Sequence, residues 1–200
     1  IDEQRGCSKY GRQQGHRWRC HYRRRGRDGR KRVLDGRGRN RRDRTFCQQF
    51  AGAMTVMLRS LGMMVERGPG DEAESFFDVL RAMLFYIDEF PERLHHTKES
   101  DLLFPRVARL APQTMDAIIQ LEKDHAKSEA GVRELQHLLL AWELIGDARR
   151  AEFETAAKRY IEAYMTHMRL EETDILPVAQ QVLSDDDWKE LDAAFATNCD

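Results

Sequence analysis

The chain of 200 residues is long enough for one domain with appendages, and its charge is nearly balanced at a net −1. The charges are unevenly distributed along the chain. Residues 1–45 carry 17 basic and 5 acidic side chains, whereas residues 46–200 carry 16 basic and 29 acidic ones. Short apolar runs, four scattered Cys without a CxxC pair and the lack of an apolar leader exclude a membrane span and a disulfide framework, and predict a soluble cytoplasmic protein.

Residues 1–45 form an arm that is rich in Arg and Gly and poor in core-forming residues. Val33 and Leu34 are its only adjacent aliphatic pair. Such a segment buries too little apolar surface to offset its loss of conformational entropy, so the composition predicts a disordered arm. Two other interpretations stay open. Clustered Arg is typical of surfaces that bind nucleic-acid phosphates, and the composition also matches out-of-frame translation of GC-rich DNA, in which case the arm is not natural coding sequence.

Residues 46–200 predict an all-α protein, because no segment alternates polar and apolar residues with a period of two. Helices are expected at Phe46–Arg67, about Asp71–Lys98, about Pro112–Leu144, from Ala148 to beyond Glu171, and at Trp188–Phe195. Pro91 is expected to kink the second helix, and Ser184 to cap the last one. Four long amphipathic helices with short links predict an up-down four-helix bundle, followed by a short C-terminal helix.

One short motif occurs twice, near the end of the second and of the fourth predicted helix. The first copy is HHTKESDLLFP at His95–Pro105, and the second is HMRLEETDILP at His167–Pro177, 72 residues later. Each copy begins with His, has Glu four residues on, and ends in two large apolar residues and a Pro. The closing Pro is expected to end each helix just beyond the motif.

Three His-x-x-x-Glu pairs result, one in each of three predicted helices: His95 with Glu99, His125 with Glu129, and His167 with Glu171. Residues four apart lie on nearly the same side of a helix. A single pair is usually a solvated surface pair worth about 0.2–0.5 kcal/mol. His125, however, shares a seven-residue spacing with Ile118 and Val132, and is therefore expected to face inward. Because buried imidazoles and carboxylates are costly unless paired or bound to a cation, three inward pairs predict a metal site.

Imidazole and carboxylate ligands without thiolates favour iron, with manganese or zinc as less favoured alternatives. Six ligands exceed the four that one tetrahedral zinc ion takes. Carboxylates can bridge two ions, so the expected content is a pair of non-haem iron ions.

The motifs HHTKESDLLFP, DHAKSE and HMRLEETDILP, in this order, resemble those of the hemerythrin-like, or HHE cation-binding, family over about Phe76–Phe195. The resemblance implies that residues 46–200 form a four-helix bundle with a diiron centre that binds or senses dioxygen, nitric oxide or iron. It maps ligand positions onto His95, Glu99, His125, His167 and Glu171. Glu129 stands where oxygen-carrying members have another His, and the first helix lacks the His that members supply there.

Two other functions compete with a binding or sensing role. A diiron enzyme, or a protein that repairs iron centres, would use the same ligands and is the second interpretation. Nucleic-acid binding through the basic arm ranks third.

Four further residues carry expectations of their own. His96 points about 100° away from His95 on an α-helix, which predicts a surface or supporting role. His137 is out of phase with His125 and is expected in solvent. Tyr160 and Tyr164 are expected to pack in the core, with a hydrogen bond to a ligand carboxylate as the sharper alternative.

Overall fold

The computed structural model describes residues 45–71 and 73–197, and their side chains from Phe50 onward. The expected arm of residues 1–45 therefore lies outside the described residues, except for Thr45. Within the described ranges the chain is helical and contains no strand, which confirms the all-α prediction. None of the helices there combines the length and the apolar character that a bilayer crossing requires.

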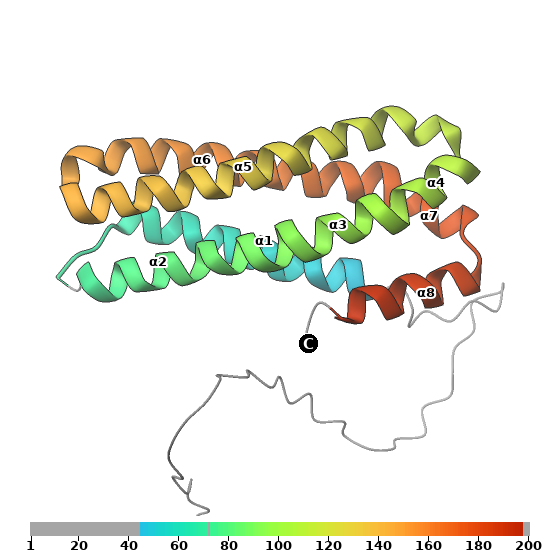
Figure 1. The fold of residues 1–200 in the computed structure, drawn as a ribbon, viewed down its shortest axis with the longest axis horizontal. Coiled ribbons are helices and arrows are strands. Elements are labelled where there is room, and N and C mark those ends of the chain that lie inside the picture. The colour runs from blue at the N-terminus through green and yellow to red at the C-terminus, as the bar shows by residue number, and fades with distance from the viewer. Residues whose placement is uncertain (1–44, 72, 198–200) are drawn as a thin grey trace, which may run out of the picture.

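The described helical segments follow one another either directly or across short turns. They are α1 (Thr45–Arg67), α2 (Ala73–Ile87), η1 (Asp88–His95), α3 (His96–Lys98), η2 (Glu99–Leu103), α4 (Phe104–Leu110), η3 (Pro112–Thr114), α5 (Met115–Ile145), η4 (Asp147–Arg149), α6 (Arg150–Leu170), η5 (Glu171–Ile175), α7 (Leu176–Val182) and α8 (Asp185–Ala196). Figure 1 shows the long helices α1, α2, α5 and α6 side by side along the long axis of the molecule. α5 packs along α6, α1 against α6, and α2 against α5.

The two motif copies fold alike, and neither Pro ends its helix. Helical backbone runs without a break from Ala73 to Leu110, so Pro105 lies within the helical path. The turn before each Pro is π-helical, and the N–H of Phe104 donates to the carbonyl of Glu99, five residues earlier. Leu176 and Glu171 repeat this bond in the second copy. Just before each Pro, the backbone hydrogen bonds change from a spacing of four residues to a spacing of five. Each Pro therefore stands in the first turn of the next helix, where its missing N–H costs little.

A third π-helical segment, η1, contains Pro91 and leads directly into the first motif copy. The N–H of His96 donates to the carbonyl of Pro91, again five residues earlier. A π turn holds more residues than an α turn. Side chains beyond η1 therefore point in directions that differ from those expected for a continuous α-helix.

Two apolar clusters fill the interior, and polar residues separate them along the helices. Large side chains such as Trp142 and Phe153 belong to the first cluster. Leu121, Ile175 and Phe195 belong to the second. On α5 the second cluster ends at Leu121 and the first begins at Val132, with buried His125 between them. The polar interior is therefore flanked by apolar packing on both sides.

The last helix, α8, begins at the predicted cap. The backbone N–H of Asp187 donates to Ser184 Oγ at 3.2 Å, and the Asp187 carboxylate accepts from the Ser184 N–H at 3.0 Å. These two bonds satisfy donors that the first turn of a helix otherwise leaves unpaired. α8 lies at the end of the molecule where α4 and α7 also end (Figure 1), and its Phe195 ring contacts the His95 ring edge-on at 5.1 Å.

We predict that Ser184→Ala lowers the free energy of unfolding by about 0.5–2 kcal/mol, because it removes the acceptor that caps α8. Hydrogen bonds from Ser184 hold the pKa of Asp187 below its ordinary value. A depressed carboxyl pKa gives stability that is present above the ordinary pKa of about 4 and is lost as the pH falls through the folded value. The difference between wild type and variant should therefore shrink below about pH 4. Urea titrations of wild type and variant at pH 7 and at low pH measure this difference in the free energy of unfolding.

Thr166→Ala, at an exposed position in the C-terminal part of α6, serves as the control and should stay within about 0.5 kcal/mol of wild type. Equal unfolding free energies for Ser184→Ala and wild type at pH 7 would show that the cap contributes nothing.

Candidate metal centre

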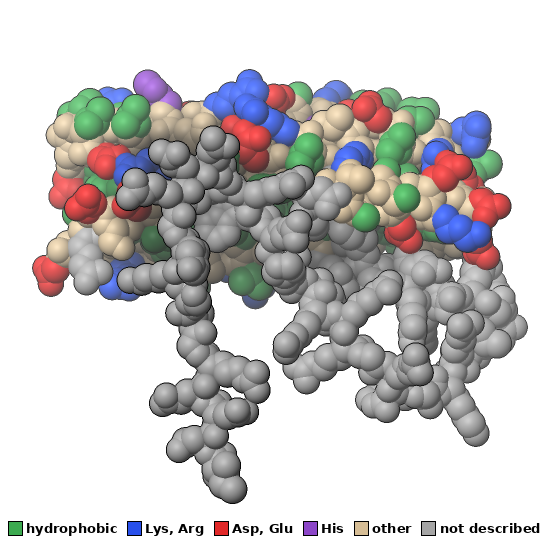
Figure 2. Space-filling model, turned by 60° about the horizontal axis from the view of Figure 1, so that its bottom comes forward, with side chains coloured by type: hydrophobic (Ala, Val, Ile, Leu, Met, Phe, Trp, Pro, Cys, Tyr) green, Lys and Arg blue, Asp and Glu red, His purple; other side chains and the backbone are tan. Residues whose placement is uncertain are grey.

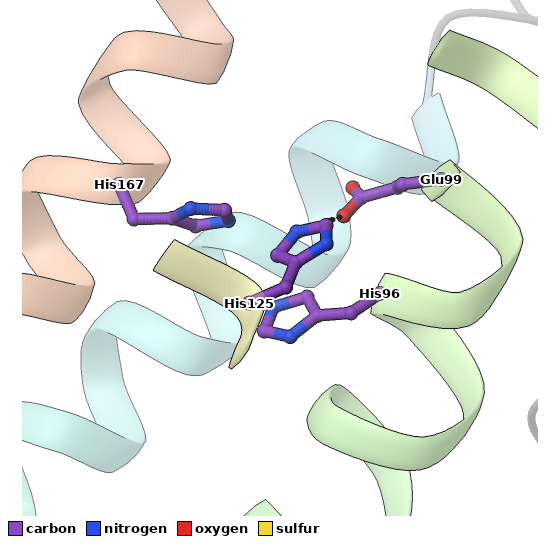
Figure 3. Close-up of side chains that lie close together, drawn as sticks. All are labelled: His96, Glu99, His125 and His167. Carbon is purple, nitrogen blue, oxygen red and sulfur yellow. Dashed lines mark ion pairs between the residues drawn. The ribbon is translucent and has the colours of Figure 1, made fainter. Parts of the chain in front are cut away.

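Four buried side chains gather between the two apolar clusters: His96, Glu99, His125 and His167. Each offers one ligand atom, and these atoms all lie within 4.8 Å of one another. Figure 3 shows the four side chains pointing toward one common place, with His96 and Glu99 on one helical segment and His125 and His167 on two others. The segments are α3 with the start of η2, α5 and α6, which approach from different sides.

His96 belongs to the cluster although an α-helical count directs it away. The π-helical segment η1 adds residues to the turns before the motif, so that His95 and His96 both come to lie inside, with exposed fractions of 2% and 4%. The expectation that His96 lies at the surface is therefore wrong. His95 is held apart from the other rings by aromatic contacts, since it stacks on Phe50 of α1 with ring centroids 3.7 Å apart.

A buried hydrogen-bond network orients His96. Its Nδ1 donates to Glu92 Oε2 at 3.0 Å, and the other oxygen of Glu92 accepts from Tyr160 at 2.8 Å and from Ser128 at 2.5 Å. With the proton on Nδ1, the lone pair of His96 is on Nε2 and accepts from the Tyr164 hydroxyl at 3.1 Å; a cation at Nε2 would take the place of this hydrogen bond. A carboxylate bonded to the far nitrogen of an imidazole is the arrangement that fixes metal-binding histidines.

His125 is oriented in the same sense by a serine. The Ser100 hydroxyl donates to Glu122 at 2.9 Å, so its oxygen accepts from His125 Nδ1 at 3.1 Å. The lone pair of His125 is then on Nε2, which lies 3.4 Å from Glu99 Oε2. The His125 ring also stacks on His96, with centroids 4.0 Å apart and planes 9° from parallel.

The protonation states of His167 and Glu99 suit a cation, whereas a cation bound to Glu171 would have to displace a proton. Burial, and then the nearby His96 ring, lower the pKa of His167 to about 3, so its imidazole is neutral near pH 7 and can act as a ligand. Burial acts to raise the pKa of Glu99, but the electrostatic effect of the adjacent His95 imidazole opposes it, and the pKa is held well below the usual value. Burial, followed by the Glu99 carboxylate, raises the pKa of Glu171 well above its ordinary value.

Buried polar atoms without hydrogen-bond partners concentrate here within the described part of the chain. They are His95 Nδ1, both carboxylate oxygens of Glu99, His125 Nε2, His167 Nδ1 and Glu171 Oε1. Glu99 Oε1 lies 2.8 Å from His95 Nε2, but without the alignment of a hydrogen bond. Leaving such atoms unpaired costs about 1–3 kcal/mol each, and a bound cation would pair them. The residues present therefore fit a metal ion.

The six residues predicted as ligands fall into three groups. Glu99, His125 and His167 lie in the four-residue cluster. His95 and Glu171 are buried beside it, with unpaired atoms of their own. Glu129 is not brought to the cluster: α5 is a regular α-helix there, the Glu129 side chain is 47% exposed, and it pairs with Arg133 at 2.5 Å.

Three supporting residues were not identified from the sequence: Glu92, Ser100 and Ser128. Glu92 precedes His96 by four residues, so a Glu-x-x-x-His pair overlaps the first motif copy and could have revealed both. Ser128, three residues after His125, takes the inward place that was assigned to Glu129. His137 is exposed, as predicted. Tyr160 and Tyr164 are buried and make the hydrogen bonds of supporting residues, Tyr160 to the Glu92 carboxylate and Tyr164 to an imidazole.

Comparison with known proteins agrees with this geometry. The family described as hemerythrin HHE cation binding domain matches residues 52–179. An uncharacterised protein of Haemophilus influenzae is 33% identical over 98 residues, which is 49% of this chain and 55% of that protein, so the chain spans about half the length of this relative. The family match takes in α2 to α6 and every residue of the buried cluster. The chain thus belongs to the hemerythrin HHE cation-binding domain family.

Proposed function

We propose that the chain binds non-haem iron at the buried His and Glu cluster and holds two ions when fully occupied. The observation that carries the proposal is the set of four donor residues within 4.8 Å, surrounded by buried polar atoms that lack hydrogen bonds. Imidazole nitrogen and carboxylate oxygen without thiolate favour iron over metals that prefer sulfur. The up-down four-helix bundle is the proposed scaffold, with ligands from facing helices.

Two ions follow from the number and the placement of the donors. His96, Glu99, His125 and His167 suffice for one ion, and His95 and Glu171 add donors directly beside it. Both carboxylates are buried, and the Glu99 carboxylate raises the pKa of Glu171, which indicates that the two groups lie close together. Carboxylates in this position can be shared by two ions.

The function we infer is binding or sensing of a small molecule such as dioxygen or nitric oxide, or sensing of iron itself. Bound iron supplies a redox-active Lewis acid. The protein's own residues orient the imidazoles through Glu92 and Ser100, and the flanking apolar clusters bury most of the site. A diiron enzyme or iron-centre repair protein is the second candidate, and a cleft that reaches His167 between α5 and α6 favours it.

Nucleic-acid binding through the basic arm ranks below these functions. The arm lies outside the described residues. The described surface drawn in Figure 2 carries acidic and basic side chains interspersed with hydrophobic ones, and on that face it shows no continuous basic patch of the kind that binds phosphates.

We predict that protein purified from iron-supplied cells contains close to two iron atoms per chain, because six donors are present and the carboxylates can be shared. Elemental analysis gives the ratio, and an absorption band in the near ultraviolet or visible region reports ferric iron. Zinc alone at full occupancy, or no metal, would overturn the proposal.

Single substitutions test the ligand set. His96→Ala and His167→Ala should each lose most of the iron, because both remove a donor from the central cluster. His95→Ala should retain more, since His95 lies beside the cluster and would serve the second ion. Metal content per folded chain, measured after gel filtration, separates these cases.

His137→Ala and Glu129→Gln are the matched controls, one an exposed His and the other the half-buried acid that sequence spacing had favoured. Both should keep the wild-type iron content. Loss of iron in Glu129→Gln, or equal iron content in all five variants, would contradict the assignment made here.

A further inference from the structure

A cleft of about 340 Å³ opens between α5 and α6, and His167 of the metal cluster forms part of its lining. Small residues create the space: Ala130 and Gly131 on α5, and Ala156 and Ala163 on α6. Where neighbouring helices carry larger side chains at such positions, the side chains fill the gap between them. The volume lies in the range of about 300–1,000 Å³ that is typical of small-molecule sites.

One wall of the cleft depends on a glycine. A Cβ atom at Gly131 would lie 3.0 Å from Cδ2 of the Tyr160 ring, closer than ordinary van der Waals contact. The absence of a side chain lets the flat ring of Tyr160 rest against the α5 backbone. The ring can then line the cleft while its hydroxyl reaches Glu92 in the interior.

The hydroxyl groups of both lining tyrosines are already used. Tyr160 donates to Glu92 at 2.8 Å, and Tyr164 bonds His96 Nε2 at 3.1 Å. What the tyrosines offer to an occupant is therefore the faces of their rings, next to the methyl groups of the alanines.

The rim of the cleft offers no uncompensated charge. Arg159 of α6 lies 3.3 Å from Glu134 of α5, and Lys127 lies 3.8 Å from Asp124. All four line the cleft, and the two cations balance the two anions. An ionic ligand would compete with these pairs, whereas a neutral ligand leaves both intact.

We propose that the α5–α6 cleft binds a neutral, flat, largely apolar organic molecule and places it against His167. The volume corresponds to about ten molecules of liquid water at about 30 Å³ each, far more than a diatomic gas needs. Aromatic faces and methyl groups favour a planar apolar body through offset stacking and burial of apolar surface. That the occupant is a substrate or effector of bound iron rests on the proposed function; its binding to the cleft does not.

The test uses isothermal titration calorimetry on the full chain as purified, with indole as a neutral planar probe and benzoate as its charged counterpart. We expect indole to bind and benzoate to bind at least tenfold more weakly. The double variant Ala130→Leu/Ala163→Leu fills the cleft from both helices and should weaken indole binding at least tenfold. Ala130 and Ala163 are both exposed, so the added side chains do not enter the core.

Ala82→Leu, the same change at an exposed helical position on α2, is the matched control and should bind indole like wild type. Gly131→Ala is a second, independent variant, and should weaken binding because its methyl group displaces the Tyr160 ring. Unchanged indole affinity in both the double variant and Gly131→Ala would overturn the cleft proposal, and so would tighter binding of benzoate than of indole.

Iron content measured on the same samples keeps the two proposals apart. Indole binding that the double variant abolishes, in protein without iron, would leave the cleft assigned and refute the iron site. Full iron content together with indole binding that no cleft variant alters would support the iron site and refute the cleft proposal.

Discussion

The structure depends on how the chain satisfies ionisable groups that it buries between two apolar clusters. Four imidazoles and the carboxylates of Glu99 and Glu171 lie there with almost no access to solvent, and several of their polar atoms lack hydrogen-bond partners. Removing such groups from water is costly unless each is paired. A protein that is only marginally stable does not tolerate several such losses without compensation. A cation bound to these atoms supplies that compensation, and the surrounding fold is arranged to present them to it.

The π-helical turns provide that arrangement. Each copy of the repeated motif starts such a turn at its Glu, so that Glu99 and Glu171 occupy equivalent places in two helices. Segment η1 rotates the first copy so that His96 enters the cluster. Insertions of this kind inside α-helices occur frequently at functional sites, where they redirect side chains at the expense of regular hydrogen bonding.

Much of the fold and part of the site follow from sequence pattern. Hydrophobic spacing identified the helical elements and placed His125 and His167 inside, because α5 and α6 are regular and an α-helical count holds along them. α-Helical spacing gave the wrong position for His96, because nothing in the local pattern of apolar residues indicates a π turn around Pro91. It also favoured Glu129, although Ser128 on the neighbouring position is the residue that turns inward. The link from Glu92 through Tyr160 joins residues 68 positions apart, and only the packing of α6 beside η1 brings them together.

The most direct test of a compensating cation compares the free energy of unfolding of the full chain with and without iron. Urea titrations under anaerobic conditions, in a chelator and in ferrous iron at 100 times the dissociation constant, give this difference. The account predicts stabilisation by about 2.7 kcal/mol or more, and loss of that gain in His167→Ala but not in His137→Ala. Identical unfolding curves for wild type with and without iron would contradict it.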